Sequence, residues 1–216
     1  MDYITVYEGG EGYYEEKKSR FIANVRHVTT EEEAEAFLQE IRKKYYDASH
    51  SCYAYTLGKK QETVKCSDAG EPSGTAGQPI LSVLSGQKIT DAIIVVTRYF
   101  GGTLLGTGGL VRSYTKAAQD GIEQSVIVHK YTAELLKIVT DYNGIGKLQY
   151  FFGQEGLNPT DQSFTEVVTV MLPVPEERTE AVMKKITDLT NGKAVITKEK
   201  QLFYGMVGKE AVLFED

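Results

Sequence analysis

A strand that leads directly into a glycine-rich loop and a helix constrains the fold of this 216-residue chain more than any other feature. Residues 92–97 read AIIVVT, an uninterrupted apolar run, which predicts a strand buried on both faces or lying in the middle of a sheet. Five glycines follow within residues 98–109, so the strand is expected to end there. The next segment predicts a helix with one apolar face, formed by Leu110, Val111, Tyr114, Ala117, Ala118, Gly121 and Ile122.

Two helices and a strand are predicted in the residues that precede this strand, loop and helix. Thr30 and Glu33 form a T-x-x-E capping box, and apolar residues recur at helical spacing as far as Tyr45, which predicts a helix over residues 30–45. A shorter helix is expected to carry Ile80, Leu81 and Leu84. Residues 19–25 alternate, which predicts a strand in a sheet with one solvent-exposed face. Its inward side chains are Phe21, Ala23 and Val25, and its outward ones are Arg20 and Asn24.

Residues 50–57 and 62–66 flank a Gly-Lys-Lys-Gln turn and predict a hairpin. The expected register brings Cys52 close to Cys66, and two reduced thiols are the favoured interpretation because cytosolic disulfides are rare. Tyr53 and Tyr55 share one face of the first strand. Such tyrosines can stack on nucleobases or anchor a protein partner, or they can cover the edge of the core with their hydroxyls in water.

The pattern changes from about residue 125, and we expect one domain over residues 1–127 and a second over 128–216. The second half predicts a strand at 132–139, a helix at 143–152 and a strand at 164–173. A helix that begins at Pro175 and ends at Asn191-Gly192 follows, with Val182, Met183, Ile186 and Leu189 inward, and then a strand at 193–197. With a short strand at 158–162, the order is βαββαβ, that of a ferredoxin-like sandwich.

The overall charge argues against a broad nucleic-acid-binding surface. The chain has 24 Lys and Arg against 30 Asp and Glu, a net charge of −6, whereas indiscriminate polyanion binding depends on clustered cations. Residues 48–128 are nearly neutral, with seven basic and six acidic residues. Any anion site there must rely on backbone N–H groups and a few arginines.

No apolar run approaches the roughly 20 residues of a membrane span, so no membrane association is expected. The first residues, MDYITVYEGG, lack the basic and apolar regions of a secretory signal, which favours a cytoplasmic location. Cysteine and histidine residues do not occur at zinc-binding spacing. We therefore expect no metal and no cofactor.

Two glycine-rich loops, each immediately before a helix, are the candidate functional segments. Helix N-termini expose unpaired backbone N–H groups, and glycine lets an anion approach them, so the loops predict a site for phosphate or a nucleic-acid backbone. The alternative is that the glycines serve tight turns and close packing of helix on sheet. The predicted contacts are Ser73, Gly74, Thr75, Gly77, Arg98, Gly106, Thr107, Gly108, Gly109, Arg112 and Lys116.

Catalytic motifs are not evident. The loops match neither the Walker A pattern nor G-x-G-x-x-G after a strand with an acidic partner, and G-x-S-x-G does not occur. Asp68, Glu71 and Thr75 are the polar groups that an enzyme acting on a small phosphorylated or anionic metabolite could use in the same cleft. For Asp68 and Ser73, capping and loop hydrogen bonds are the favoured interpretation, and no catalytic residue is assigned.

The two loops also carry a family resemblance. DAGEPSGTAGQPIL (68–81) and VVTRYFGGTLLGTGGLVRSYTKAA (95–118) resemble the signature of the YigZ/IMPACT family, in its bacterial two-domain type. The resemblance implies an α+β fold of two domains. The first would be an IMPACT domain similar to one in a small-subunit ribosomal protein, the GHMP kinases and the fourth domain of elongation factor G, and the second would be ferredoxin-like.

Eukaryotic IMPACT proteins are translation regulators, and they carry a preceding RWD domain that is not found in this sequence. The resemblance implies a non-enzymatic cytoplasmic binding protein associated with translation regulation, with RNA, the ribosome or a translation-related protein as partner. The metabolite enzyme is one alternative. A protein-interaction module that uses the tyrosine-bearing sheet and the second domain is another.

Overall fold

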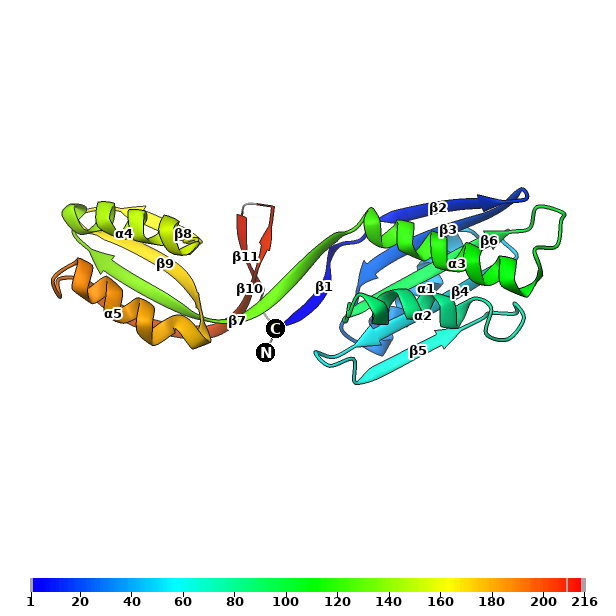
Figure 1. Ribbon diagram of the computed structural model, residues 1–216, viewed down its shortest axis with the longest axis horizontal. Coiled ribbons are helices and arrows are strands. Elements are labelled where there is room, and N and C mark those ends of the chain that lie inside the picture. The colour runs from blue at the N-terminus through cyan, green and yellow to red at the C-terminus, as the bar shows by residue number, and fades with distance from the viewer. Residues whose placement is uncertain (1, 209, 215–216) are drawn as a thin grey trace. The chain divides into compact units, whose positions relative to one another are not determined.

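The computed structural model describes residues 2–208 and 210–214. The chain forms two compact units, one of residues Tyr3–Val128 and one that combines Asp2 with the residues from His129 onward (Figure 1). Both contain helices packed on an antiparallel sheet, as an α+β fold requires.

The first domain is built on a five-stranded sheet with the strand order β2-β3-β6-β4-β5, in which every neighbouring pair is antiparallel. Strand β6 occupies the centre, and all of its residues except the last are buried, as the apolar run predicts. Strand β1 (Tyr3–Glu8) precedes the sheet. The sheet strands are β2 (Glu11–Glu16), β3 (Ser19–His27), β4 (His50–Leu57), β5 (Thr63–Ser67) and β6 (Ala92–Tyr99).

Helices cover both faces of this sheet. Helices α2 (Gly77–Gly86) and α3 (Gly106–Glu123) pack on one face, and α1 (Glu31–Lys44) packs on the other against Tyr55, Ile93 and Val95 (Figure 1). The expectation of a solvent-exposed sheet face is therefore wrong. Asn24, which was expected to face outward, is only 7% exposed.

The predicted helix boundaries in this domain are close to those observed. Thr30 is the N-cap of α1, where its Oγ1 accepts a hydrogen bond from the Glu33 N–H at 3.2 Å, and Tyr45 is the C-cap. Helix α3 presents its apolar face to the sheet with one correction. Val111 is 37% exposed, and Ser113 is buried in its place, because the helical phase turns Val111 toward solvent.

Close approach between α3 and β2 depends on glycine. A Cβ atom on Gly12 would overlap the backbone nitrogen of Gly121 and lie 2.7 Å from the carbonyl oxygen of Ala117. The close packing of helix on sheet therefore requires a residue without a side chain at Gly12.

The β4–β5 hairpin differs from its expected register by two residues. Ala54, rather than Cys52, lies opposite Cys66, because the turn extends through Gln61, whose φ is positive, and β5 begins only at Thr63. Both cysteines are free thiols, as predicted.

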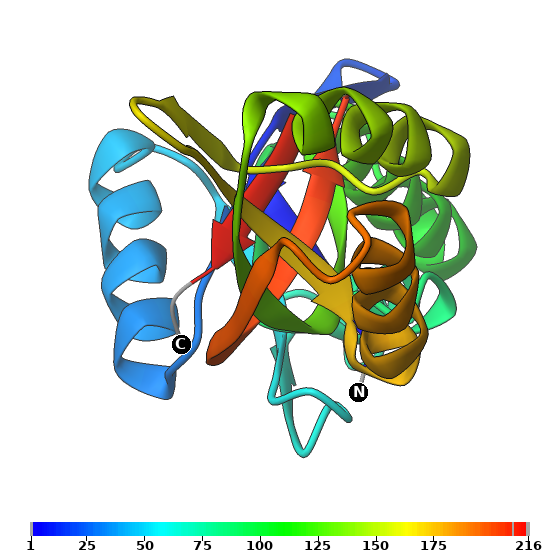
Figure 2. The same ribbon diagram turned by 90° about the vertical axis from the view of Figure 1, so that its left-hand side faces the viewer.

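The second domain has the predicted βαββαβ order. Its sheet has the strand order β11-β10-β7-β9-β8 with antiparallel neighbours, and α4 and α5 pack on one face (Figure 2). The two strands expected at 158–162 and 164–173 begin later, at Asp161 and Val168, and a further strand, β11, follows the predicted elements. The elements are β7 (Val126–Thr140), α4 (Tyr142–Glu155), β8 (Asp161–Phe164), β9 (Val168–Pro175), a 3₁₀ turn (Glu176–Arg178), α5 (Thr179–Leu189), β10 (Val195–Val207) and β11 (Glu210–Phe214).

Candidate functional site

A groove of about 520 Å³ opens in the first domain where both glycine-rich loops meet the sheet. One side comes from the start of β4 and from the first loop, and the other comes from the end of β6, the second loop and the first turns of α3. The lining residues are Ser49, His50, Glu71, Pro72, Arg98, Phe100, Leu104, Leu105, Gly106, Thr107 and Leu110.

The N-terminus of α2 is already occupied by a carboxylate of the chain itself. Asp68 accepts hydrogen bonds from the N–H groups of Gly74 at 2.8 Å, Ala76 at 2.9 Å and Gly77 at 2.9 Å. Partial burial raises the pKa of the Asp68 carboxyl, but these three bonds outweigh it, so the pKa lies below its usual value. The capping interpretation of Asp68 describes this arrangement.

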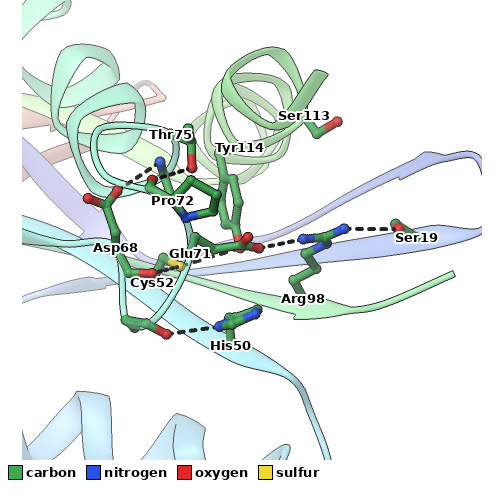
Figure 3. A network of polar contacts seen from close by, with 12 residues as sticks. Ser19, His50, Cys52, Asp68, Glu71, Pro72, Thr75, Arg98, Ser113 and Tyr114 are labelled. Atoms are coloured by element: carbon green, nitrogen blue, oxygen red, sulfur yellow. Dashed lines mark hydrogen bonds and ion pairs between the residues drawn. The ribbon is translucent and has the colours of Figure 1, made fainter. Parts of the chain in front are cut away.

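The other residues of the first loop that were predicted to contact an anion are also arranged around this cap. Thr75 is 4% exposed, and its hydroxyl donates to the carbonyl oxygen of Pro72 at 2.7 Å (Figure 3). Ser73 is exposed at the tip of the loop. The amides of Gly74 and Gly77 point at Asp68 rather than at a ligand, because a local carboxylate satisfies them. The geometry therefore disfavours the predicted anion site at the first loop.

Arg98, which is one of the predicted anion contacts, lines the groove as a buried ion-pair partner. Its Nη1 lies 2.7 Å from Oε1 of Glu71, and the same oxygen accepts a hydrogen bond from the Tyr114 hydroxyl at 2.8 Å. Figure 3 shows Glu71 between these two partners. Arg98 is 6% exposed, and its Nε has no hydrogen-bond partner within residues 2–208 and 210–214. The ion pair forms the floor of the groove.

A cysteine and a tyrosine extend this network beneath the groove. The Cys52 Sγ lies 3.3 Å from the Tyr114 hydroxyl and 2.9 Å from the carbonyl oxygen of Asp68. Burial raises the pKa of the Cys52 thiol to about 12, and burial also raises the pKa of Tyr114. A buried thiol that stays protonated near neutral pH is a poor nucleophile, so the network is structural as it stands.

Sequence reasoning did not predict this network as a unit. Glu71 stands in the first loop and Arg98 near the end of β6. Their opposite charges are the one signal in the sequence that could have paired them. His50 at the groove edge has its Nδ1 at 2.9 Å from the carbonyl oxygen of Ala69. Because a carbonyl only accepts hydrogen bonds, this contact assigns the Nδ1 proton to His50.

The N-terminus of α3 lacks both the N-cap side chain that serves α1 and α4 and the Asp68 carboxylate that serves α2. Helix α5 has no side-chain cap either, but it carries Glu180 in its first turn. The N-cap residue of α3 is Leu105, and within the described chain neither a side-chain cap nor an acidic residue occupies its first turn. Gly106, Thr107 and Gly108 are exposed there, and Gly106 has a φ of +70°. Gly109 is buried against Leu105. These first-turn N–H groups are therefore without a carboxylate of the kind that Asp68 supplies to α2.

Two cations follow along α3. Arg112 is exposed, and its Nη1 lies 3.6 Å from the position that a Cβ on Gly108 would occupy, so its guanidinium lies over the first turn. Arg112 makes no ion pair or hydrogen bond with any residue that the structure describes. Lys116 lies one turn farther on, with its Nζ 4.9 Å from the centre of the Tyr14 ring.

The tyrosine face proposed for stacking or partner binding is largely covered. Tyr53 and Tyr55 stack on each other with ring centres 6.3 Å apart, but Tyr55 is 3% exposed and its hydroxyl donates to Glu31 of α1 at 2.7 Å. Helix α1 thus occupies the surface on which a base or partner was expected.

In the described ranges, His, Cys, Asp and Glu side chains form no group of three or more that could hold a metal ion. The helices in those same ranges are all too short or too polar to span a membrane.

Comparisons with known proteins match both domains. The model of the Impact N-terminal domain matches residues 17–122, and a domain of unknown function (DUF1949) matches residues 138–193. A solved structure described as a crystal structure of a hypothetical protein superposes with a TM-score of 0.58 at 29% identity. It covers 92% of this chain and 98% of that one.

The IMPACT family member YvyE of Bacillus subtilis is 40% identical over 202 residues, which make up 94% of this chain and 93% of that protein. The Protein IMPACT homolog of Dictyostelium discoideum is 37% identical over 106 residues, 47% of this chain and 30% of that protein. The resemblance carried by the two glycine-rich loops is thereby confirmed, and the chain belongs to the IMPACT family, with an Impact N-terminal domain followed by a DUF1949 domain.

Proposed function

We propose that this chain is a non-enzymatic cytoplasmic binding protein associated with translation regulation, and that it holds a phosphate of RNA at the start of α3. The observation that carries the proposal is the uncapped N-terminus of α3, which opens on the groove beside Arg98. A helix N-terminus carries about half a positive charge and several unpaired N–H groups, and an anion stabilises it.

The surroundings of this helix end favour an anionic ligand. Gly106 and Gly108 leave the backbone open to close approach, and Thr107 between them is exposed. Arg112 adds a free guanidinium over the first turn, although a cation near a helix N-terminus is electrostatically unfavourable by itself. A bound phosphate would relieve this unfavourable pairing. By contrast, Thr30, Asp68 and Asp141 already satisfy the N-termini of α1, α2 and α4.

Membership of the family is consistent with a regulatory, non-enzymatic protein, and RNA or the ribosome as the partner is our proposal. The Impact N-terminal domain model matches residues 17–122, which include the groove-lining residues. The proposed site accordingly narrows the eleven predicted residues to Gly106, Thr107, Gly108 and Arg112, with Lys116 one turn away.

A binding titration with single-stranded RNA and with purified ribosomes, repeated between 50 and 200 mM salt, tests the proposal. We expect salt-dependent binding, and we expect Arg112→Gln to weaken it and to reduce the log–log salt slope by about 0.7, the value for one cation on a single strand. Arg42→Gln is the matched control, because Arg42 is an exposed arginine on α1, away from the groove lining. Absence of binding at low salt, or equal effects of the two variants, contradicts the proposal.

A further inference from the structure

The groove at the start of α3 has an apolar side as well as a polar one. Phe100 is 50% exposed and Leu104 is 83% exposed, and both line the groove together with the first turn of α3. Two large apolar side chains exposed side by side along one groove give it an apolar surface of the kind that marks a ligand-binding groove. An inorganic anion alone would leave them without a partner.

We propose that the groove takes one unpaired nucleotide of single-stranded RNA, with the base stacked on Phe100 and the phosphate at Gly106–Gly108. The inference rests on the proposed function and adds the class of nucleic acid to it. A nucleotide has the two parts that the groove offers to a ligand, a flat apolar surface and an anion. A groove of about 520 Å³ also lies within the usual range of small-molecule sites.

Phe100 is held in a way that suits stacking. The Arg98 guanidinium carbon lies 5.6 Å from the centre of the Phe100 ring, and the buried Glu71 carboxylate fixes that guanidinium. One side of the ring is therefore backed by a cation, while half of the side chain stays accessible to a ligand. Aromatic side chains in such settings stack on bases with little sequence preference.

Arg98 supplies a second observation that is independent of the helix end. It lines the groove, it is more than nine-tenths buried, and its Nε is a donor without a partner within the described ranges. An unsatisfied buried donor is costly, and Arg98 keeps one such donor in the floor of the groove. The groove thus offers the N–H groups of the first turn of α3 to an anion and the Phe100 ring to a base.

The unpaired state of the nucleotide follows from this geometry. In an RNA duplex the bases are stacked on their neighbours and the faces are inaccessible, so recognition uses the backbone and the minor groove. A ring at the mouth of a groove cannot reach a base inside such a helix. Binding should therefore discriminate strongly between single and double strands.

The test is a fluorescence anisotropy titration of the full chain with three probes. They are a labelled ten-nucleotide RNA, the same strand annealed to its complement, and inorganic polyphosphate as an anion without bases. We expect the single strand to bind at least tenfold more tightly than the duplex. Phe100→Ser should weaken single-strand binding about tenfold and leave polyphosphate binding unchanged, whereas Phe100→Trp should keep the wild-type affinity.

Tyr46→Ser is the matched control, because Tyr46 is an aromatic residue 86% exposed on the same domain and does not line the groove. Urea unfolding of each variant verifies the fold. Equal binding of both RNA forms, or an unchanged affinity of Phe100→Ser, overturns the stacking inference while leaving the proposed anion site intact. Failure of all three probes to bind the wild-type protein overturns both.

Discussion

The Glu71 carboxylate lies 2.7 Å from Nη1 of Arg98, and the two side chains are 3% and 7% exposed. Glu71 comes from the first glycine-rich loop and Arg98 from the end of the central strand β6, so their ion pair joins the two segments beneath the groove. The Tyr114 hydroxyl of α3 donates a hydrogen bond to the same carboxylate, which joins the helix to these two segments. An ion pair and a hydrogen bond therefore hold the floor of the groove together.

Breaking this pair should be strongly destabilising. Arg98→Met leaves the Glu71 carboxylate buried without its cation, and we expect a loss of about 3–5 kcal/mol in the free energy of unfolding. The double variant Arg98→Met/Glu71→Leu should recover most of that loss, because it removes both charges together. Urea denaturation of the two variants measures the difference. A loss below about 1 kcal/mol for Arg98→Met would show that the pair does not hold the floor.

Because the Asp68 carboxylate caps α2, the free energy of unfolding should depend on pH. The pKa of Asp68 lies below its usual value of 3.8 in the folded chain, so the folded state binds the proton less readily than the unfolded state. The stabilisation is fully present above the unfolded pKa and is lost as the pH falls through the lower, folded pKa. We expect Asp68→Ala to cost about 1–2 kcal/mol at pH 7.

The difference between wild type and Asp68→Ala should shrink as the pH is lowered below about 4. Asp68→Asn is the control, since its amide oxygen still accepts a backbone hydrogen bond but does not titrate. Unfolding curves recorded from pH 7 to pH 3 measure the effect. A difference that stays constant over this range would contradict the role of the carboxylate charge.

The two thiols should react very differently. Cys52 is 0% exposed, and burial raises its pKa to about 12, whereas Cys66 is half-buried. A chromogenic disulfide reagent at pH 8 should therefore modify one thiol in the folded protein and two in denaturant. Cys66→Ser should abolish the reaction of the folded protein and Cys52→Ser should not. Rapid modification of both thiols in the folded state would be the opposite result.

Because α3 packs closely on β2, a side chain at Gly12 should lower the stability of the fold. Gly12→Ala should lower the unfolding free energy by more than 2 kcal/mol, on the order of the penalties for overpacking, because its Cβ would overlap the backbone of Gly121. Gly86→Ala in the same domain meets no atom within 4 Å and should be neutral or stabilising, since alanine favours a helix. Thermal unfolding compares them, and equal stability of the two variants would refute the packing argument.

Local sequence patterns predict much of the fold. The capping box at Thr30 and the apolar run of β6 lie where the local signals place them, because each depends on residues close in the chain. The helix expected to begin at Pro175 begins only at Thr179, because Pro175 is the last residue of β9 and a 3₁₀ turn follows it, although the helix ends before Asn191-Gly192 as predicted. The alternation in residues 19–25 did not predict that a helix covers the second face of the first sheet. Helix α1 covers that face by packing Phe37 and Leu38 on strands that are far apart from them in sequence, and alternation within a single strand carries no information about this packing.

The candidate site was predictable only in part. The glycine-rich segments indicate two helix starts, and the capping interpretation of Asp68 at the first of them is confirmed. That the second start has no such carboxylate is visible only in three dimensions. Arg98 illustrates the same limit, since an arginine next to a loop can face solvent or pair internally. Its pairing with Glu71 joins residues separated by 27 positions, a distance at which the sequence pattern gives no preference.

The measurement that tests the central claim most directly is a backbone amide NMR titration of the ¹⁵N-labelled chain with the ten-nucleotide single-stranded RNA. If the uncapped start of α3 holds the phosphate, the amide signals of Gly106, Thr107 and Gly108 shift as ligand is added. The amides of Gly74, Ala76 and Gly77, which already donate to Asp68, stay in place. Unchanged signals at residues 106–108, or larger shifts at residues 74–77, would contradict the account.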